Sequence, residues 1–325
     1  MPAIPKLMER ESRAERSAQI KAQALELGFD KVGIAQPDAL SPELSRLEEW
    51  LARGFQGEMG WMTRDPTQRT DPRLVFPQTR SVVVVALNYY TPHEHSDNPG
   101  KVSRYAWGDD YHEVVGGKLR ELRAWIEQQW PEAEGKVCVD IQPLMDKAWA
   151  VRAGLGWTGK HTNLITEEYG SWIFIGELLL NLELEYTGEV VADQCGSCTL
   201  CIDACPTSAI VDPYVVDSNL CISHATIESR APELPPAVAL HLEGWLYGCD
   251  ICQDVCPWNQ MTPATEESRF EPRAGNVNAS LAEILELTPD SYAARFRHNA
   301  MKRAKLSGLK RNALSLMSHP DHDGA

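Results

Sequence analysis

The chain has 325 residues, of which 43% are hydrophobic, and a formal net charge of −15 from 31 basic and 46 acidic side chains. This length allows two or three domains with a large core, and no apolar run approaches the roughly 18 residues of a membrane-spanning helix. The composition therefore excludes a protein built on membrane helices, and the acidic excess argues against one that binds nucleic acid over its whole surface.

Residues 1–20 do not resemble an export signal. They contain charged side chains, but neither a following apolar stretch nor a twin-arginine pair. We therefore expect a cytoplasmic location, where thiols stay reduced.

The first half of the chain alternates helices with short strands. Gly28 ends the first predicted helix, Ser41 and Pro42 begin the second, and the third has a single apolar face. The predicted helices cover residues 17–28, 41–54, 110–130 and 144–152. The predicted strands cover residues 29–35, 81–90, 136–142 and 171–182. This order predicts an α+β domain, but it does not give the order of the strands in the sheet.

A glycine-rich segment, Gly154-Leu-Gly156-Trp-Thr-Gly159, matches the G-x-G-x-x-G pattern. A dinucleotide site needs a strand before this pattern and a helix after it. Here a helix precedes it and a strand follows, so we reject that interpretation. The three polar residues after the loop can bind a ligand, and a plain tight turn is an equal alternative. These residues are Lys160, His161 and Asn163.

Cysteines dominate the next segment. Cys195-x-x-Cys198-x-x-Cys201-x-x-x-Cys205-Pro has the spacing of a bacterial ferredoxin site, in which the fourth cysteine binds the other cluster. A second run, Cys249-x-x-Cys252-x-x-x-Cys256-Pro, lacks one ligand because position 246 is Leu, and Cys221 is the nearby cysteine that can replace it. We predict two 4Fe-4S clusters. The ligands of the first are Cys195, Cys198, Cys201 and Cys256, and those of the second are Cys205, Cys221, Cys249 and Cys252.

Two other uses of these cysteines explain the pattern less well. Zinc sites also use C-x-x-C pairs, but two zinc ions would not account for two Cys-Pro endings at ferredoxin spacing. A disulfide framework is typical of short secreted domains. The ninth cysteine, Cys138, is expected to be a small core residue.

The C-terminal region, residues 263–325, predicts helices at 280–288, 291–299 and 304–318. Seven basic residues and no acidic one occur between positions 291 and 320. They are Arg295, Arg297, Lys302, Arg303, Lys305, Lys310 and Arg311. This basic patch on an acidic chain is compatible with a polyanion docking at one place. A solvated helix face is the ordinary alternative.

Asp140 is a candidate general acid. It lies between apolar neighbours near a strand end, where partial desolvation would raise its pKa. A surface or capping aspartate is the more ordinary interpretation. His93, His95 and His112 hint at a metal, but no pair has a convincing ligand partner. Asp110-Tyr-His112-Glu-Val-Val-Gly is one residue too long for the D-x-H-x-x-G pattern that places a histidine below a corrinoid cobalt.

Several strings together resemble the epoxyqueuosine reductase family. They are SRYAWGDDYH, VDIQP, RAGLGWTGKHTNLI, CGSCTLCIDACPTSAI, NLCISHATIESR and CDICQDVCPWNQ. The resemblance extends over about residues 20–315. Reductive dehalogenases are related to this family but usually have an export signal.

The resemblance implies a cytoplasmic oxidoreductase with three parts. A mixed-sheet domain that binds cobalamin and substrate would cover residues 1–190, a ferredoxin-like domain with two 4Fe-4S clusters residues 191–262, and a short basic helical segment residues 263–325. The implied reaction reduces epoxyqueuosine to queuosine at the wobble position of tRNA. Expected partners are tRNA carrying epoxyqueuosine in its anticodon and a low-potential donor of the flavodoxin or ferredoxin type. We expect no membrane partner and a monomer.

The resemblance also assigns residues. Asp140, in its D-x-x-P string, matches the proton donor of the family. Seven residues fall in the corrinoid-lining strings: Arg64, Arg104, Tyr105, Asp140, Lys160, His161 and Asn163. We assign contacts with tRNA phosphates to Lys302, Arg303, Lys305, Lys310 and Arg311. The alternatives are a corrinoid-dependent, dehalogenase-like reductase of a small molecule and a non-enzymatic electron carrier.

Overall fold

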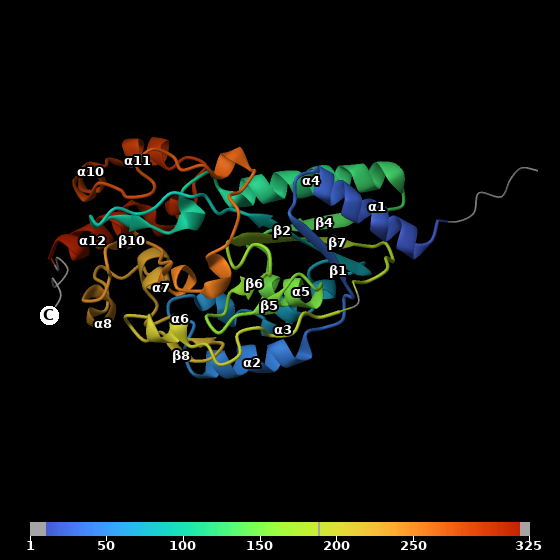
Figure 1. Ribbon diagram of the computed structural model, residues 1–325, viewed down its shortest axis with the longest axis horizontal. Helices are drawn as coiled ribbons and strands as arrows, with labels where there is room; N and C mark the ends of the chain where they lie inside the picture. The colour runs from blue at the N-terminus through green and yellow to red at the C-terminus, as the bar shows by residue number, and fades with distance from the viewer. Residues whose placement is uncertain (1–10, 188, 319–325) are drawn as a thin grey trace, which may run out of the picture.

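An antiparallel four-stranded sheet organises the N-terminal half of the protein (Figure 1). The computed structural model describes residues 11–187 and 189–318. The sheet order is β1 (Lys31–Ala35), β2 (Ser81–Asn88), β7 (Ile173–Leu180) and β4 (Gly135–Cys138). Strands β2 and β7 pair along their whole length and are largely buried, which explains their continuous apolar sequences. The four predicted strands are confirmed.

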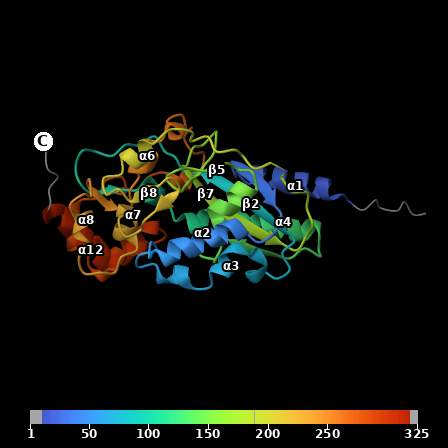
Figure 2. The ribbon, with the colours of Figure 1, turned by 90° about the horizontal axis from the view of Figure 1, so that it is seen from below.

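Helices cover both faces of this sheet (Figures 1 and 2). On one face, α1 (Arg13–Glu26) and α4 (Tyr111–Gln129) pack against alternate residues of β2, such as Val83 and Val85. On the other face, α5 (Asp146–Arg152) packs against Val82 and Val84. Helix α2 (Ser41–Ala52) follows Leu40, which is buried in the same cluster as α5.

Two elements differ from their predicted bounds for local reasons. Helix α1 begins before residue 17 because Ser12 and Glu15 form a reciprocal capping box at its N-terminus. Strand β4 ends at Cys138 rather than at residue 142, because a tight turn begins at Val139.

The cysteine-rich region consists of short elements around a second core. They are α6 (Leu200–Asp203), β8 (Ile210–Asp212), β9 (Val215–Val216), α7 (Ile222–Ile227), α8 (Pro236–Ala239), β10 (Trp245–Tyr247) and α9 (Ile251–Asp254). Strand β10 pairs in parallel with β3 (Lys101–Val102) from the first half of the chain. The second core combines residues from all three predicted domains, so the domain boundaries stay predictions.

The chain ends in α10 (Leu281–Glu286), α11 (Pro289–Arg295) and α12 (Lys305–Ser318), which lie at the opposite end of the molecule from α1 (Figure 1). The three predicted C-terminal helices are confirmed. The remaining helical and strand elements are α3 (Pro66–Thr70), β5 (Trp157–Thr158), β6 (Leu164–Ile165) and six 3₁₀ segments: Gly60–Thr63, Pro72–Leu74, Arg104–Ala106, Pro257–Asn259, Ser268–Phe270 and Ala300–Ala304. No helix within the described ranges is long and apolar enough to cross a membrane.

The sequence suggested that the basic residues of the C-terminal region face outward. In the structure not all of them do. Arg311 is buried, and its guanidinium donates hydrogen bonds to the carbonyls of Ala225, Ser229 and Ala231. The prediction that Arg311 contacts RNA is therefore wrong, because its charge is used to hold α12 on the cysteine-rich region. Arg303 is exposed but forms a bidentate ion pair with Glu228.

The predicted absence of an export signal concerns residues 1–20, of which 1–10 lie outside the described residues. The outer ends of the first and third predicted domains, residues 1–10 and 319–325, lie outside them as well.

Candidate cluster sites and active site

The first predicted set of cluster ligands lines one cavity of about 280 Å³. Cys195, Cys198, Cys201 and Cys256 all belong to its lining. Two of them lie beside the paired short helices α6 and α9, where Cys201 is within α6 and Cys256 follows α9. Ile165, Leu200 and Trp258 add apolar walls. A cavity bounded by four thiols and apolar walls, with Lys160, His161 and Gln194 as its other polar residues, is suited to a 4Fe-4S cluster.

The second predicted set is deeper in the protein. Burial raises the pKa of Cys252, and the neighbouring Cys221, Asp250, Cys201 and Cys205 raise it further, so one cysteine of the first set lies near it as well. Burial likewise raises the pKa of Cys249, with Cys252 and Cys221 among its neighbours. The four sulfurs therefore lie close enough to influence one another. Within the described residues no three His, Cys, Asp or Glu side chains converge on a single ion. In a cubane each cysteine binds its own iron.

The ninth cysteine is separate from both sets. Cys138 is fully buried at the end of β4, opposite Glu177 of β7. Burial raises the pKa of its thiol. It packs in the apolar core beneath α5, as the sequence predicted.

Asp140 occupies a strained turn after β4. Its φ of 56° lies in the left-handed region, and the amide of Ile141 donates a 2.5 Å hydrogen bond to the carbonyl of Val139 across it. The Asp140 side chain is 59% exposed, and Ile141 beside it is 76% exposed. Strain at an accessible carboxylate is characteristic of functional sites.

The Asp140 carboxylate accepts contacts from two residues at the start of α4. Tyr111 Oη donates to Asp140 Oδ2 at 2.5 Å, and His112 Nε2 lies 3.4 Å from the same oxygen. The other ring nitrogen, His112 Nδ1, is 2.7 Å from Oδ1 of Asp110. Two carboxylates therefore hold one imidazole between them.

These contacts determine the charges of Asp140 and His112. Burial alone would raise the pKa of Asp140, but the hydrogen bonds from His112 and Tyr111 outweigh it and hold the pKa below its usual value. Burial would lower the pKa of His112, but Asp110 and Asp140 together raise it to about 9. The expectation that apolar neighbours raise the pKa of Asp140 is therefore wrong. At neutral pH the proton is on His112.

Lys147 links this site to the second set of cysteines. Its Nζ donates a 2.7 Å hydrogen bond to Oδ1 of Asn163. Burial lowers the pKa of Lys147, and the negative charges of Cys252 and Asp140 oppose that shift, so the ammonium lies near both. Yet the side chain keeps contact with solvent.

A carboxyl pair, Asp146 and Glu177, lies next to Lys147 in the fold. Glu177 of β7 is fully buried, and neither of its carboxylate oxygens has a hydrogen-bond partner by distance and angle. Burial raises the pKa of Glu177, and the nearby charge of Asp146 raises it further. Burial and the charge of Asp140 likewise raise the pKa of Asp146. The sequence analysis did not foresee this pair, in which both carboxyls have a pKa above the usual range.

The seven residues that the resemblance assigned to the cofactor do not all meet. Asp140, Tyr105 and Asn163 lie in one region. Burial raises the pKa of Tyr105, and the nearby charge of Asp140 raises it further. Asn163 accepts a hydrogen bond from Lys147, which lies near Asp140. Arg64 is exposed at the end of the Gly60–Thr63 segment. Its amide and the side chain of Arg69 both donate to the carbonyl of Trp61. The charge of Arg69 interacts with that of Asp146.

The other three have contacts with other parts of the protein. The guanidinium of Arg104 is buried between aromatic rings and donates to the carbonyls of Thr91 and His93, so it has a structural role. Lys160 and His161 line the 280 Å³ cavity with the first cysteine set. His161 also accepts a hydrogen bond from the amide of Asn163, so it lies next to the region of Asp140 and Lys147. The assignment of these three residues to a corrinoid stays a prediction.

The glycine-rich loop that precedes Lys160 is a tight hairpin. A side chain at Gly156 would meet the carbonyl oxygen of Ile165 at 2.0 Å. Gly156 therefore serves the close approach of β5 and β6, as a tight turn requires. Ligand binding by the polar residues after the loop stays a prediction.

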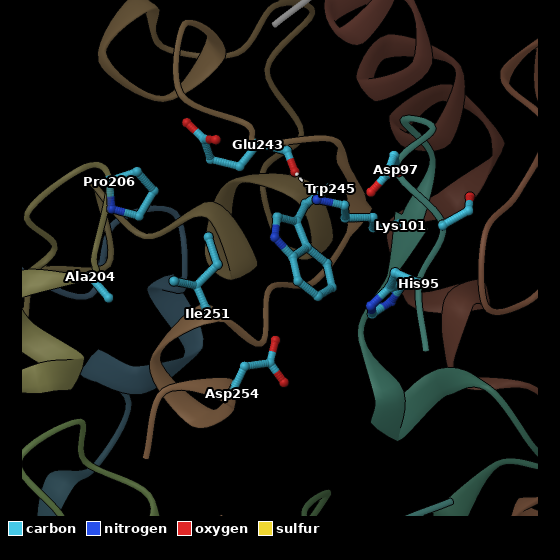
Figure 3. Close-up of a pocket in the computed structure, with 10 residues that line it drawn as sticks. His95, Asp97, Lys101, Ala204, Pro206, Glu243, Trp245, Ile251 and Asp254 are labelled. Carbon is cyan, nitrogen blue, oxygen red and sulfur yellow. Dashed lines mark hydrogen bonds between the residues drawn. The ribbon is translucent and has the colours of Figure 1, made fainter. Parts of the chain in front are cut away.

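A larger cavity of about 520 Å³ lies beside the cysteine-rich region (Figure 3). His95 and Trp245 stack edge to face at 4.9 Å in it, and Lys101 donates to the carbonyl of Glu243. None of the eight predicted cysteine ligands lines it. Its carboxylates, Asp97, Glu243 and Asp254, make it unsuited to phosphate.

Sequence reasoning missed His112, Tyr111 and Lys147 as parts of the site. The signals were weak. His112 was considered only as a cobalt ligand, whereas Asp110 both caps α4 and holds the imidazole. Glu177 offered a clearer signal, as the single carboxylate within the apolar run IFIGELLL.

Comparisons with known proteins identify the family. A family model described as epoxyqueuosine reductase QueG, DUF1730, matches residues 69–141, and a 4Fe-4S double cluster binding domain matches residues 194–259. A curated epoxyqueuosine reductase from Cellulophaga algicola is 44% identical over 301 residues, which cover 93% of this chain and 98% of the relative. The chain belongs to the epoxyqueuosine reductase family. Another member, from Synechocystis sp., is 49% identical over 272 residues, 82% of this chain and 93% of that protein.

Solved structures of epoxyqueuosine reductases have the same fold. One, with an epoxyqueuosine-modified stem loop of tyrosine tRNA, is 30% identical and has a TM-score of 0.86, covering 93% of this chain and 80% of that one. Another, from Bacillus subtilis, has an aspartate catalytic loop swung out of the active site; it is 28% identical, with a TM-score of 0.86, and the match covers 93% of this chain and 81% of that one. This chain is therefore an oxidoreductase of this family with a 4Fe-4S double cluster binding domain, rather than a non-enzymatic carrier.

The ligand assignment can be tested with one substitution and its matched control. Cys221→Ala should remove one cluster and lower the iron content from ~8 to ~4 per chain. Cys138→Ala should keep ~8, because this thiol lies in the apolar core. Iron analysis of anaerobically purified protein checks both values. Full iron content in Cys221→Ala would show that another group completes the second site.

Proposed function

We propose that this chain reduces epoxyqueuosine at the wobble position of tRNA to queuosine. The observation that supports it most is the carboxylate of Asp140, held in a strained, accessible turn by Tyr111 and His112. The curated relatives have the same activity in their name. A structural relative is bound to an epoxyqueuosine-modified tRNA stem loop.

The residues around Asp140 fit a large, partly polar cofactor such as cobalamin. Asp140 and Lys147 are surrounded by protein but remain accessible, and the exposed Ile141 adds an apolar surface. An apolar side chain at this exposure is suited to covering the face of a macrocycle. Asp140, Tyr105, Asn163 and Arg64 would hold the group. When bound, cobalamin would supply a low-potential cobalt that transfers an electron pair to the epoxide carbon.

The two cysteine sets suggest a path for electrons. Cys198 of the first set is exposed, so its cluster is accessible to a low-potential donor of the flavodoxin or ferredoxin type. Cys221 and Cys252 of the second set lie near Lys147, which lies near Asp140. We propose that electrons enter at the first cluster and leave from the second.

The reaction needs two protons as well as two electrons. Both carbon–oxygen bonds of the epoxide break, a carbon–carbon double bond forms, and the oxygen leaves as water. Because Asp140 is ionised and His112 is protonated, we propose that the first proton starts on His112 Nε2 and reaches the epoxide oxygen through the carboxylate. Both described contacts fall on Oδ2, which leaves Oδ1 for the substrate.

Exposed lysines near the start of α12 are the proposed RNA contacts. Lys302 and Lys305 are exposed, and Lys310 is half-buried. Arg303 is paired with Glu228 and contributes less free charge. RNA phosphates would be bound by the two exposed lysines, and the unpaired wobble base can be extruded toward Asp140.

Replacing the proposed acid tests the function directly. Asp140→Asn should lower the turnover of epoxyqueuosine-tRNA at least ~100-fold, because an amide cannot pass on a proton. Iron content should be unchanged. Asp290→Asn, an exposed aspartate of α11, is the matched control and should keep wild-type turnover. Product analysis by mass spectrometry of digested tRNA measures both. Wild-type turnover by Asp140→Asn would remove this residue from the mechanism.

The charge state of His112 predicts an alkaline limit to activity. Its raised pKa means that the imidazolium is present below about pH 9 and is lost as the pH rises through this value. Turnover should therefore fall tenfold per pH unit above ~9. His112→Gln keeps an N–H donor but cannot titrate, so the slower variant should lose this limb. A limb that persists unchanged in His112→Gln would assign it to another group.

The proposed RNA contacts predict a salt-dependent effect. Combined Lys302→Ala and Lys305→Ala should weaken tRNA binding about tenfold and reduce the slope of log affinity against log salt by between ~1 and ~2. Turnover at saturating tRNA should be unchanged. Lys136→Ala, at an exposed lysine of β4, is the control. Equal affinities for the double variant and wild type would place the RNA on another surface.

A further inference from the structure

Two buried N–H groups lie at the first cysteine set. His161 Nε2 and Trp157 Nε1 are both inaccessible to solvent, and His161 Nε2 makes no hydrogen bond within the described residues. The indole of Trp157 is directed at the thiol of Cys195, where it opposes the rise in pKa that burial causes. An unpartnered buried donor is unfavourable, so native proteins rarely keep one. The two donors therefore indicate acceptors at this cysteine set, of which Cys195 is one.

Both side chains adjoin the first set of cysteines. His161, which is only 4% exposed, lines the 280 Å³ cavity together with Cys195 and Cys256. Trp157 packs in one apolar cluster with Cys256, with Cys195 and Trp258 at its edge. The donors therefore lie beside thiols that approach from both cysteine runs.

The protonation of His161 follows from its backbone contact. The amide of Asn163 donates to His161 Nδ1 at 3.2 Å, so Nδ1 has no proton and Nε2 must have one. Burial, assisted by the positive charge of Lys147, lowers the pKa of His161 to about 4, so the ring stays neutral. The indole of Trp157 can only donate. Both nitrogens are thus donors at neutral pH.

We infer that His161 Nε2 and Trp157 Nε1 donate hydrogen bonds to the sulfur atoms of the cluster in this cavity and raise its reduction potential. Reduction adds negative charge to the cluster, and N–H donors stabilise that charge more in the reduced form than in the oxidised form. The two residues thereby set how readily the first cluster accepts an electron. This inference depends on the double cluster domain and not on the proposed substrate.

A pair of substitutions at one position tests the inference. His161→Phe keeps a ring of similar size but removes the donor, whereas His161→Gln keeps an N–H donor of similar reach. In a redox titration of the holoenzyme followed by electron paramagnetic resonance, His161→Phe should lower the ratio of reduced to oxidised first cluster about tenfold at a fixed potential. This change corresponds to ~59 mV for one electron. His161→Gln should stay close to wild type.

Internal and external controls separate this effect from general damage. The second cluster should titrate as in wild type, and His241→Phe, at an exposed histidine outside the cavity lining, should change neither potential. Trp157→Phe should shift the first cluster in the same direction, and it provides the test by itself if His161→Phe loses iron. Unchanged potentials in both His161→Phe and Trp157→Phe would overturn the inference. Equal shifts in His161→Phe and His161→Gln would overturn it as well. None of these results depends on tRNA turnover.

Discussion

The predicted cluster ligands must lose their protons to bind iron, and for those of the second site that are most deeply buried the protein interior opposes this ionisation. Burial raises the pKa of Cys221, Cys249 and Cys252, so the apo form keeps protons that the iron must displace. The surrounding structure holds the loops in place for this exchange. Asp250, between the predicted ligands Cys249 and Cys252, accepts hydrogen bonds from Ser103 Oγ and the amide of Arg104.

The C-terminal helix α12 belongs to the same framework. Asn312 donates to the carbonyls of Thr226 and Leu246, and Arg311 reaches three further carbonyls after α7 and within it. Without these donors the buried carbonyls around the second cysteine set would have no partner. One face of α12, the helix that was expected to bind RNA, therefore packs on the cysteine-rich region. Lys302 and Lys305, near the start of this helix, are exposed to solvent.

The local sequence predicted the individual helices and strands of this protein but not how they pair and pack. The β-branched runs at 81–90 and 171–182 identified the central strands, because burial on both faces requires apolar residues throughout. Cysteine spacing predicted a ligand set that meets at one cavity. The strand order, by contrast, depends on pairings between distant residues. The sequence analysis predicted a raised pKa for Asp140, whereas its pKa is lowered in the structure. The reason is that its partners Tyr111 and His112 belong to another element, the start of α4. Net charge could not distinguish the buried Arg311 from the exposed Lys302.

The parallel pairing of β3 with β10 has a consequence for synthesis of the chain. Lys101 and Val102 are made about 140 residues before Trp245 and Tyr247, their only strand partner among the described residues. At 5–20 residues per second, this segment waits ~10–30 s for its neighbour. The last cysteine ligand follows soon afterwards, at position 256. The nascent protein therefore becomes ready to receive both clusters at nearly the same moment as its two halves can first close on each other.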